Sequence, residues 1–109
     1  MSDSVDTLAL ALEHTPLPQE LVVAGTPTAG YRDITELSGL TVGVWEHTPG
    51  TSRDVESDEV FVVLTGDATV TFDDGSPPVD LRPGSLVRLR AGQRTTWTVR
   101  ETLRKVYVS

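Results

Sequence analysis

The segment Glu59-Val-Phe-Val-Val-Leu-Thr-Gly66 decides how the rest of this chain is interpreted. Its central residues, 60–64, are all apolar, so an extended segment here would need cover on both faces. They are also β-branched or aromatic for the most part, which is typical of strands. Gly66 then supplies a residue that adopts positive φ without strain. The segment predicts a strand over 59–64 that is covered on both faces, opens on an acid and ends in a turn.

Further short segments of the same composition follow one another from residue 40 onward. Glycines at 66, 75, 84 and 92 fall eight or nine residues apart, which is the rhythm of a small antiparallel barrel or jelly roll. The predicted class is therefore all-β, a single antiparallel β-barrel. Residues 1–20 are expected to form an N-terminal arm, with one or two helical turns at 8–13, and 21–109 the barrel, with 21–24 as an edge strand. The predicted strands are 41–47, 59–64, 68–72, 86–90, 95–99 and 103–108.

Composition narrows the function classes. The chain has 109 residues and no cysteine, so one domain without disulfides or thiolate chemistry is expected. No apolar run approaches the ~18 residues of a membrane span, and a soluble cytoplasmic protein is predicted. The net charge of −7 argues against nucleic acid and membranes as partners.

The charges are unevenly distributed along the chain. Residues 1–80 hold fifteen of the sixteen acidic residues, whereas residues 81–109 hold seven of the nine basic ones. Two such halves attract each other within one domain. Internal neutralisation between neighbouring strands is therefore preferred to a basic docking surface.

Two glycine-containing frames indicate a known family. Glu59, six residues and Gly66 match the end of the first cupin motif, in which two histidines precede the glutamate. Gly84, five residues and 90–92 match the start of the second motif. Over 40–108 the chain resembles the cupin subfamily of the ethanolamine-utilisation protein Q and the ureidoglycine aminohydrolase-type cupins. The residues that carry this resemblance include Gly43-Val-Trp45-Glu46, Thr48-Pro49-Gly50, Asp58-Glu59, Asp74-Gly75, Thr96-Trp97 and Arg104-Lys105-Val-Tyr107.

The resemblance implies a double-stranded β-helix of the RmlC type, but the metal-binding histidines are absent. A three-residue gap before Glu59 places Arg53 and Val55 in their positions, and a four-residue gap places Ser52 and Asp54 there. In the second motif, Thr95 replaces the histidine. Since neutral imidazole is the usual nitrogen ligand, no metal and no other cofactor is predicted.

A pocket inside the barrel is nevertheless expected. In metal cupins the counterpart of Glu59 points inward, and Arg53 could neutralise it here. Thr95 and Trp97 share a face by parity. These side chains describe either a small-ligand pocket or a filled core. The predicted ligand-binding residues are Arg53, Glu59, Phe61, Thr95, Trp97 and Tyr107.

The sequence also predicts roles or positions for several other charged and aromatic residues. Glu59 and Lys105 are the candidate catalytic residues, although Lys105 is equally a partner for Glu46 in a cross-strand ion pair. His47 is expected to be exposed, and the acidic run 54–59 to be a solvated loop. Trp45 is assigned to the core or to a dimer face.

The leading hypothesis is a cupin that binds a small organic metabolite in its barrel without a metal. One alternative is an enzyme of aminohydrolase or isomerase type that uses Glu59 for proton transfer. The other is a structural dimer module. In each case the apolar strand 59–64 suggests a homodimer formed through sheet surfaces.

Overall fold

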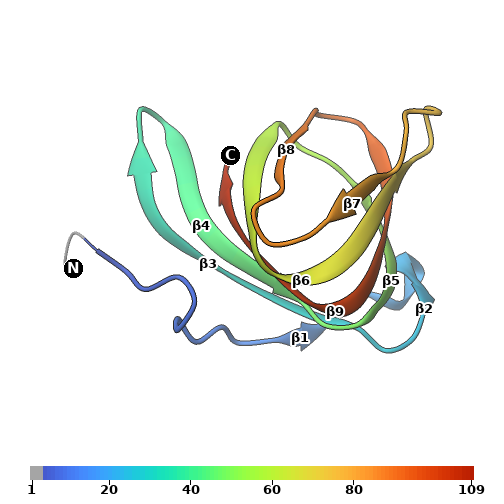
Figure 1. The fold of residues 1–109 in the computed structure, drawn as a ribbon, viewed down its shortest axis with the longest axis horizontal. Helices are drawn as coiled ribbons and strands as arrows, with labels where there is room; N and C mark the ends of the chain where they lie inside the picture. The colour runs from blue at the N-terminus through green and yellow to red at the C-terminus, as the bar shows by residue number, and fades with distance from the viewer. Residues whose placement is uncertain (1–3) are drawn as a thin grey trace.

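The computed structural model describes residues 4–109 and consists almost entirely of antiparallel strands curled into a barrel (Figure 1). This confirms the predicted all-β class. The elements are β1 (Thr15–Pro16), the 3₁₀ helix η1 (Gln19–Leu21), β2 (Val22–Ala24), β3 (Thr28–Leu37), β4 (Leu40–His47), β5 (Gly50–Val55), β6 (Glu59–Phe72), β7 (Val79–Leu81), β8 (Leu86–Leu89) and β9 (Arg94–Val108).

Strand β9 organises the barrel. One of its edges pairs with β6 along most of its length, from Phe72↔Thr95 to Val60↔Val108. The other edge pairs first with β5 and then with β4. Beyond these, β3 extends the β4 branch, β2 extends the β5 branch, and β7 and β8 pair with the free edge of β6. The predicted edge strand at 21–24 is thus confirmed as β2, beside β5.

Strands β6 and β9 each replace two predicted strands. The turn expected at Gly66 is instead a bulged bend inside β6, where the register to β9 shifts between Val63 and Ala68. Gly66 has φ +110°, and a Cβ there would lie 2.4 Å from the carbonyl oxygen of Thr102. Glycine is required at this bend by conformation and by space.

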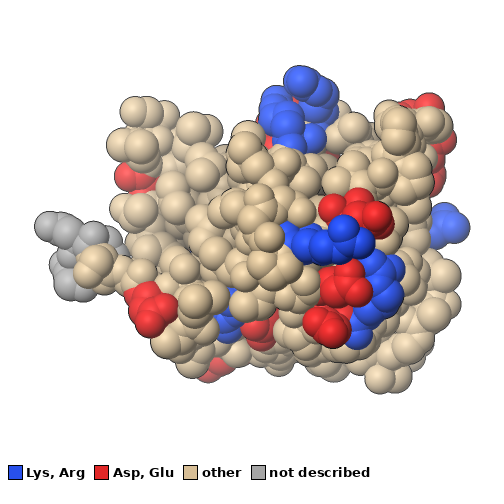
Figure 2. All heavy atoms as spheres, in the orientation of Figure 1, with Lys and Arg blue, Asp and Glu red and all other residues tan. Residues whose placement is uncertain are grey.

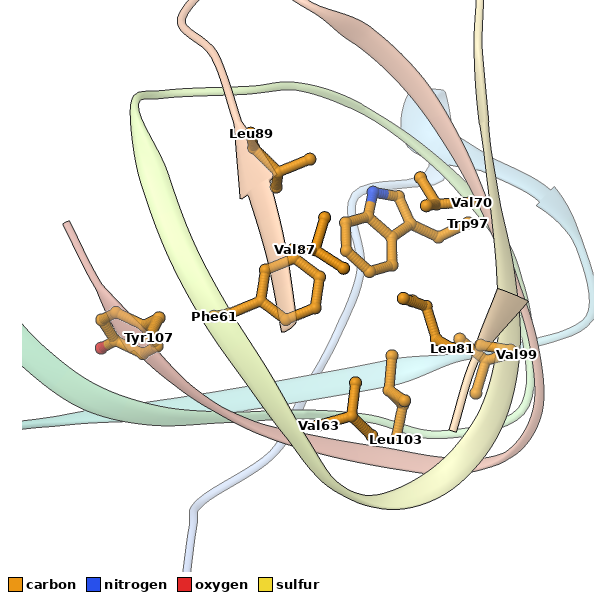
Figure 3. Close-up of a cluster of buried hydrophobic side chains, with 11 residues drawn as sticks. Phe61, Val63, Val70, Leu81, Val87, Leu89, Trp97, Val99, Leu103 and Tyr107 are labelled. Atoms are coloured by element: carbon orange, nitrogen blue, oxygen red, sulfur yellow. The ribbon is translucent and has the colours of Figure 1, made fainter. Parts of the chain in front are cut away.

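The apolar core fills one end of the barrel (Figure 3). Phe61 and Trp97 face each other there, with ring centroids 5.8 Å apart, and Tyr107 lies at the side of the cluster. The core side chains are Phe61, Val63, Ala68, Val70, Leu81, Val87, Leu89, Trp97, Val99, Leu103 and Tyr107. On the outer face of β6, Val60 is 38% exposed, and the homodimer stays a prediction.

The N-terminal arm lies against the outer face of the sheet, held by Arg104. Residues 7–9 form a turn, and the helix predicted at 8–13 is wrong. The Asp6 carboxylate accepts bonds from the N–H groups of Leu8 and Ala9, as at the start of a helix, but the chain does not continue as a helix beyond this turn. Arg104 donates to the carbonyls of Thr7 and Leu10, both at 2.8 Å.

Charges are neutralised within the sheet, as predicted. Lys and Arg lie beside Asp and Glu on the face in Figure 2. Every Lys or Arg ion pair among residues 4–109 joins an acid of the first eighty residues to a base of the last twenty-nine: Arg88–Asp58, Arg100–Asp67, Arg104–Glu46 and Lys105–Glu59. Over these same residues, no helix is both long enough and apolar enough to cross a membrane.

Candidate functional site

A cavity of about 240 Å³ lies in the barrel interior beside the apolar core. It is bounded by β3, β4, β5, the start of β6, β9 and the segment that leads into β2. Its walls combine aromatic rings with charged groups. The lining residues are Leu17, Leu21, Tyr31, Trp45, His47, Ser52, Arg53, Asp54, Glu56, Glu59, Trp97, Lys105, Tyr107 and Ser109.

A buried ion pair stands in the cavity wall. The Lys105 ammonium donates to Oε2 of Glu59 at 2.8 Å, and the two side chains are 6% and 17% exposed. The ammonium also lies 4.5, 4.2 and 4.9 Å from the ring centroids of Trp45, Phe61 and Trp97. A lysine so deep in a protein is stabilised by such a carboxylate and by the negative faces of aromatic rings.

This pairing corrects two predictions. Glu59 is neutralised by Lys105 and not by Arg53, which is exposed at the cavity rim. Lys105 is also not the partner of Glu46. In the β4–β9 register Lys105 faces Trp45 and Arg104 faces Glu46, so the two pairs lie on opposite faces of the sheet.

On that outer face, Glu46 is held by Arg104 at 2.8 Å and by Nε2 of His14 at 2.7 Å. Burial raises the pKa of the Glu46 carboxyl, but the bonds from Arg104 and His14 outweigh this and leave its pKa lowered. Glu46 therefore anchors the N-terminal arm and has no part in the cavity.

The register of β5 decides which residues replace the missing histidines. Ser52 lies opposite Trp97, and Asp54 lies opposite Thr95. Because Trp97 and Thr95 point into the barrel, Ser52 and Asp54 do so as well. The four-residue gap is thus the correct frame, and Arg53 and Val55 face outward.

Glu56 belongs to the site, and its assignment to a solvated loop is wrong. Its Oε2 accepts hydrogen bonds from the Thr95 hydroxyl at 2.6 Å and from Nε1 of Trp97 at 3.0 Å. Burial raises the pKa of the Glu56 carboxyl, although the Thr95 bond opposes the shift. Partial burial likewise raises the pKa of Asp54, which is exposed where it lines the cavity, although the Val55 N–H bond and Lys105 oppose the shift. The pKa values of these two carboxyl groups are therefore both raised.

His47 is buried, at 1% exposure, and the prediction that it is exposed is wrong. Its Nδ1 contacts the carbonyl oxygen of Thr48 at 2.6 Å, and its Nε2 contacts Oγ of Ser52 at 2.9 Å. His47 is buried because successive side chains of β4 point to opposite faces of the sheet. Glu46 points outward, whereas Trp45 and His47 point into the barrel.

Tyr107 closes another side of the cavity. Its hydroxyl donates to Oδ1 of Asp33 at 2.7 Å, and burial together with this bond raises the pKa of Tyr107. The ring passes over Gly43, where a Cβ would lie 2.3 Å from the hydroxyl oxygen. Only glycine leaves room for Tyr107 to reach β3.

The cavity brings most of the predicted ligand-binding residues together. Arg53, Glu59, Trp97 and Tyr107 line it, as does Lys105. Thr95 and Phe61 stand behind the wall, where Thr95 supports Glu56 and Phe61 supports Lys105. The sequence left Ser52 and Asp54 as one of two alternatives, and it did not assign His47 or Glu56 to the site.

The metal of many cupins does not fit these residues. The histidine positions hold Ser52, Asp54 and Thr95, and the Lys105 ammonium already occupies Glu59. Within residues 4–109, no group of three or more His, Cys, Asp or Glu side chains could hold a metal ion. A fixed ammonium beside the carboxylate also repels a second cation.

The curled antiparallel barrel with a cavity in its interior defines the protein class as a cupin jelly roll. A family model described as the EutQ-like cupin domain matches residues 35–107. The chain therefore belongs to this family of cupins.

Solved structures agree with this assignment. A protein of unknown function from Pseudomonas syringae pv. tomato is similar with a TM-score of 0.78 and 25% identity over 95% of this chain, which spans only 46% of that protein. The Clostridium difficile EutQ protein matches with a TM-score of 0.64 and 22% identity, over 75% of this chain and 67% of its own. A Rhizobium leguminosarum protein of unknown function matches with a TM-score of 0.62 and 26% identity, over 72% of this chain and 78% of its own. A search of curated proteins found no match.

Proposed function

We propose that the protein binds a small polar metabolite with an amine or similar cationic N–H group in the barrel cavity, without a metal. The observation that carries this proposal is the pair of inward carboxylates, Asp54 and Glu56, beside the Trp45 and Trp97 rings.

The two carboxylates favour a cationic group. Burial raises the pKa of both, so each ionises at a free-energy cost in the empty cavity. A bound cation would lower that cost, and a charge-assisted hydrogen bond is stronger than a neutral one. Oε1 of Glu56 has no hydrogen-bond partner within residues 4–109, and it can accept from a ligand.

Lys105 favours an oxygen acceptor on the same ligand. Glu59 is its one hydrogen-bond acceptor among residues 4–109, which leaves two ammonium protons facing the aromatic rings. A carbonyl or carboxylate oxygen could take one of them. The ligand class is thus a molecule with an N–H group at one end and an oxygen acceptor at the other.

The volume supports a metabolite of modest size. Sites for drug-sized molecules measure about 300–1,000 Å³, and this cavity of about 240 Å³ is smaller. Both indoles are in the wall, so they provide apolar contact for a short carbon skeleton and an optical signal for binding.

A thermal-shift screen tests the proposal. The panel contains small amines, amino acids and amides, each matched with the analogue that lacks nitrogen. A ligand at 100 times its Kd adds about 2.7 kcal/mol to the free energy of unfolding. We expect hits among the nitrogen compounds only, each of which also changes the tryptophan fluorescence.

Glu56→Gln supplies the matched variant. Losing the charged bond should weaken a hit by about 1.5–3 kcal/mol, or roughly tenfold to more than a hundredfold. Glu101→Gln removes an exposed carboxylate from β9 and should leave the affinity unchanged. A screen without nitrogen-containing hits, or equal affinities in wild type and Glu56→Gln, would contradict the proposal.

A further inference from the structure

His47 and Ser52 form a hydrogen-bonded pair in the cavity wall that the binding proposal does not use. His47 ends β4 and Ser52 lies in β5, and a short bend at Thr48 and Pro49 brings them together. Nε2 of His47 lies 2.9 Å from Oγ of Ser52. The residues are 1% and 5% exposed, yet both line the cavity.

The tautomer of His47 follows from its other contact. The carbonyl oxygen of Thr48 can only accept, so Nδ1 of His47 carries the proton of the 2.6 Å bond. In the neutral ring, Nε2 then has a lone pair, and the Ser52 hydroxyl donates to it. Hydroxyl, imidazole and orienting acceptor therefore stand in the order that activates a serine nucleophile.

Burial also favours the neutral form of the imidazole. Burial lowers the pKa of His47 against the Thr48 hydrogen bond that raises it, and the neighbouring His14 and Lys105 lower it further. His47 is thus neutral near pH 7. A neutral base beside a hydroxyl is the state required before nucleophilic attack.

The Lys105 ammonium lines the same cavity as Ser52 and His47, so a positive charge is available there for a developing oxyanion. Ser52 is opposite Trp97 in the β5–β9 register, and the Lys105 ammonium is 4.9 Å from the ring centroid of Trp97. The Trp45 ring centroid lies 5.5 Å from that of His47 and 4.5 Å from the ammonium, so both groups border the same indole. Serine, imidazole and ammonium thus surround one small volume.

We propose that Ser52 is a nucleophile for acyl transfer, with His47 as its general base and small carboxylic esters as the substrate class. Oγ attacks the ester carbonyl carbon while its proton passes to Nε2 of His47. The bond to the alcohol oxygen breaks, the alcohol leaves with that proton, and Ser52 is acylated. Water then gives a proton to His47 and attacks the acyl carbon. The bond from the acyl carbon to Oγ breaks, His47 returns its proton to Oγ, and the carboxylic acid is released.

A serine-directed probe tests this step without knowledge of the natural substrate. The purified wild-type protein is incubated with a small alkyl fluorophosphonate and analysed by intact mass and peptide mapping. We expect one adduct per chain, at Ser52. Ser109 lines the same cavity but is not hydrogen-bonded to an imidazole within residues 4–109, so it should stay unlabelled.

Two variants separate a catalytic pair from a structural one. Removing the general base in His47→Gln should slow labelling by about 100-fold or more, whereas Ser85→Ala, outside the cavity, should label at the wild-type rate. Thermal melts establish that each variant is folded. If a variant does not fold, the labelled position in the wild-type protein still tests the proposal by itself. Absence of an adduct, an adduct elsewhere, or equal labelling of folded His47→Gln would overturn the assignment.

Discussion

The two parts of the barrel interior use the same strands for opposite purposes. Toward β7 and β8, the side chains of β6 and β9 are aliphatic or aromatic and fill the space with each other. Toward β3, β4 and β5, those two strands contribute Glu59, Lys105 and Tyr107 to a cavity. The two regions share a wall, because Trp97 and Tyr107 belong to the apolar cluster and also line the cavity.

The difference shows how a small barrel can hold buried charge. The filled part removes apolar surface from water, which is the dominant favourable term in folding. The cavity part buries Lys105, Glu56 and His47 at a cost that specific partners must offset. Its groups are therefore paired one by one, and within residues 4–109 no buried side-chain nitrogen or oxygen lacks a hydrogen bond.

The largest expected effect is on the ion pair of the cavity wall. Lys105→Met should lower the free energy of unfolding by about 3–5 kcal/mol, because the Glu59 carboxylate is left buried without its partner. Chemical denaturation at neutral pH measures it. The double variant Lys105→Met/Glu59→Gln should recover much of the loss. If the double variant is as unstable as the sum of the single variants, the pair is not the source of the effect.

In the filled part, Leu81→Ala should cost about 2–5 kcal/mol. Leu81 is fully buried on β7, so its truncation loses apolar burial and leaves a cavity. Leu86→Ala on β8 is the matched control, since Leu86 is 73% exposed, and its effect should stay within about 0.5 kcal/mol. Equal effects at the two positions would contradict the burial described here.

Gly43→Ala tests the boundary between the two regions. The added Cβ would lie 2.3 Å from the Tyr107 hydroxyl, so the ring must move and its bond to Asp33 must break. We expect a loss of about 1–3 kcal/mol, the usual cost of overpacking. Gly39→Ala has no atom within 4 Å of its Cβ and tests the effect of strain alone, since φ there is +79°. Normal Tyr107 packing in a crystal structure of Gly43→Ala would refute this reading.

The smallest effect concerns pH. Burial lowers the pKa of His47 below its ordinary 6.5, so below that pH the unfolded chain binds a proton that the folded protein does not. As the pH decreases below 6.5, the free energy of unfolding should therefore fall by up to about 1.4 kcal/mol per pH unit. Asp54 and Glu56 oppose this loss of stability at lower pH. Their pKa values are raised in the folded protein, so it binds their protons at a higher pH than the unfolded chain does.

The contribution of His47 is isolated by comparison with His47→Gln between pH 7 and pH 5.5. We expect a shallower loss of stability in the variant as the pH falls. Parallel curves for the two proteins would mean that His47 titrates in the folded state as it does in the unfolded chain.

Much of the fold could be predicted because glycines and apolar runs report local geometry. The inward position of Glu59 and the shared face of Thr95 and Trp97 followed from motif position and parity. Strand register could not be predicted in this way, because it depends on contacts between distant segments. A shift of one residue in the motif frame, from Ser52 to Arg53, would exchange the inner and outer faces of β5.

The partner of Lys105 was missed for the same reason. Lys105 faces Trp45 on one neighbouring strand and Val63 on the other, and this places the ammonium inside the barrel. No local signal distinguishes it from Arg104, its neighbour on the opposite face. His47 carried a usable signal, since it shares its parity with Trp45, but its place at the end of a strand beside an acid suggested exposure.

The most direct test of the account measures the affinity of one screening hit for wild type, Leu81→Ala and Glu56→Gln by isothermal titration. If the filled region serves stability and the cavity serves binding, Leu81→Ala should lose stability and keep its affinity. Glu56→Gln should stay within about 1 kcal/mol of the wild-type stability, because the amide oxygen still accepts from Thr95 and Trp97. It should bind the hit at least tenfold more weakly. An affinity lost in folded Leu81→Ala and kept in Glu56→Gln would contradict the account.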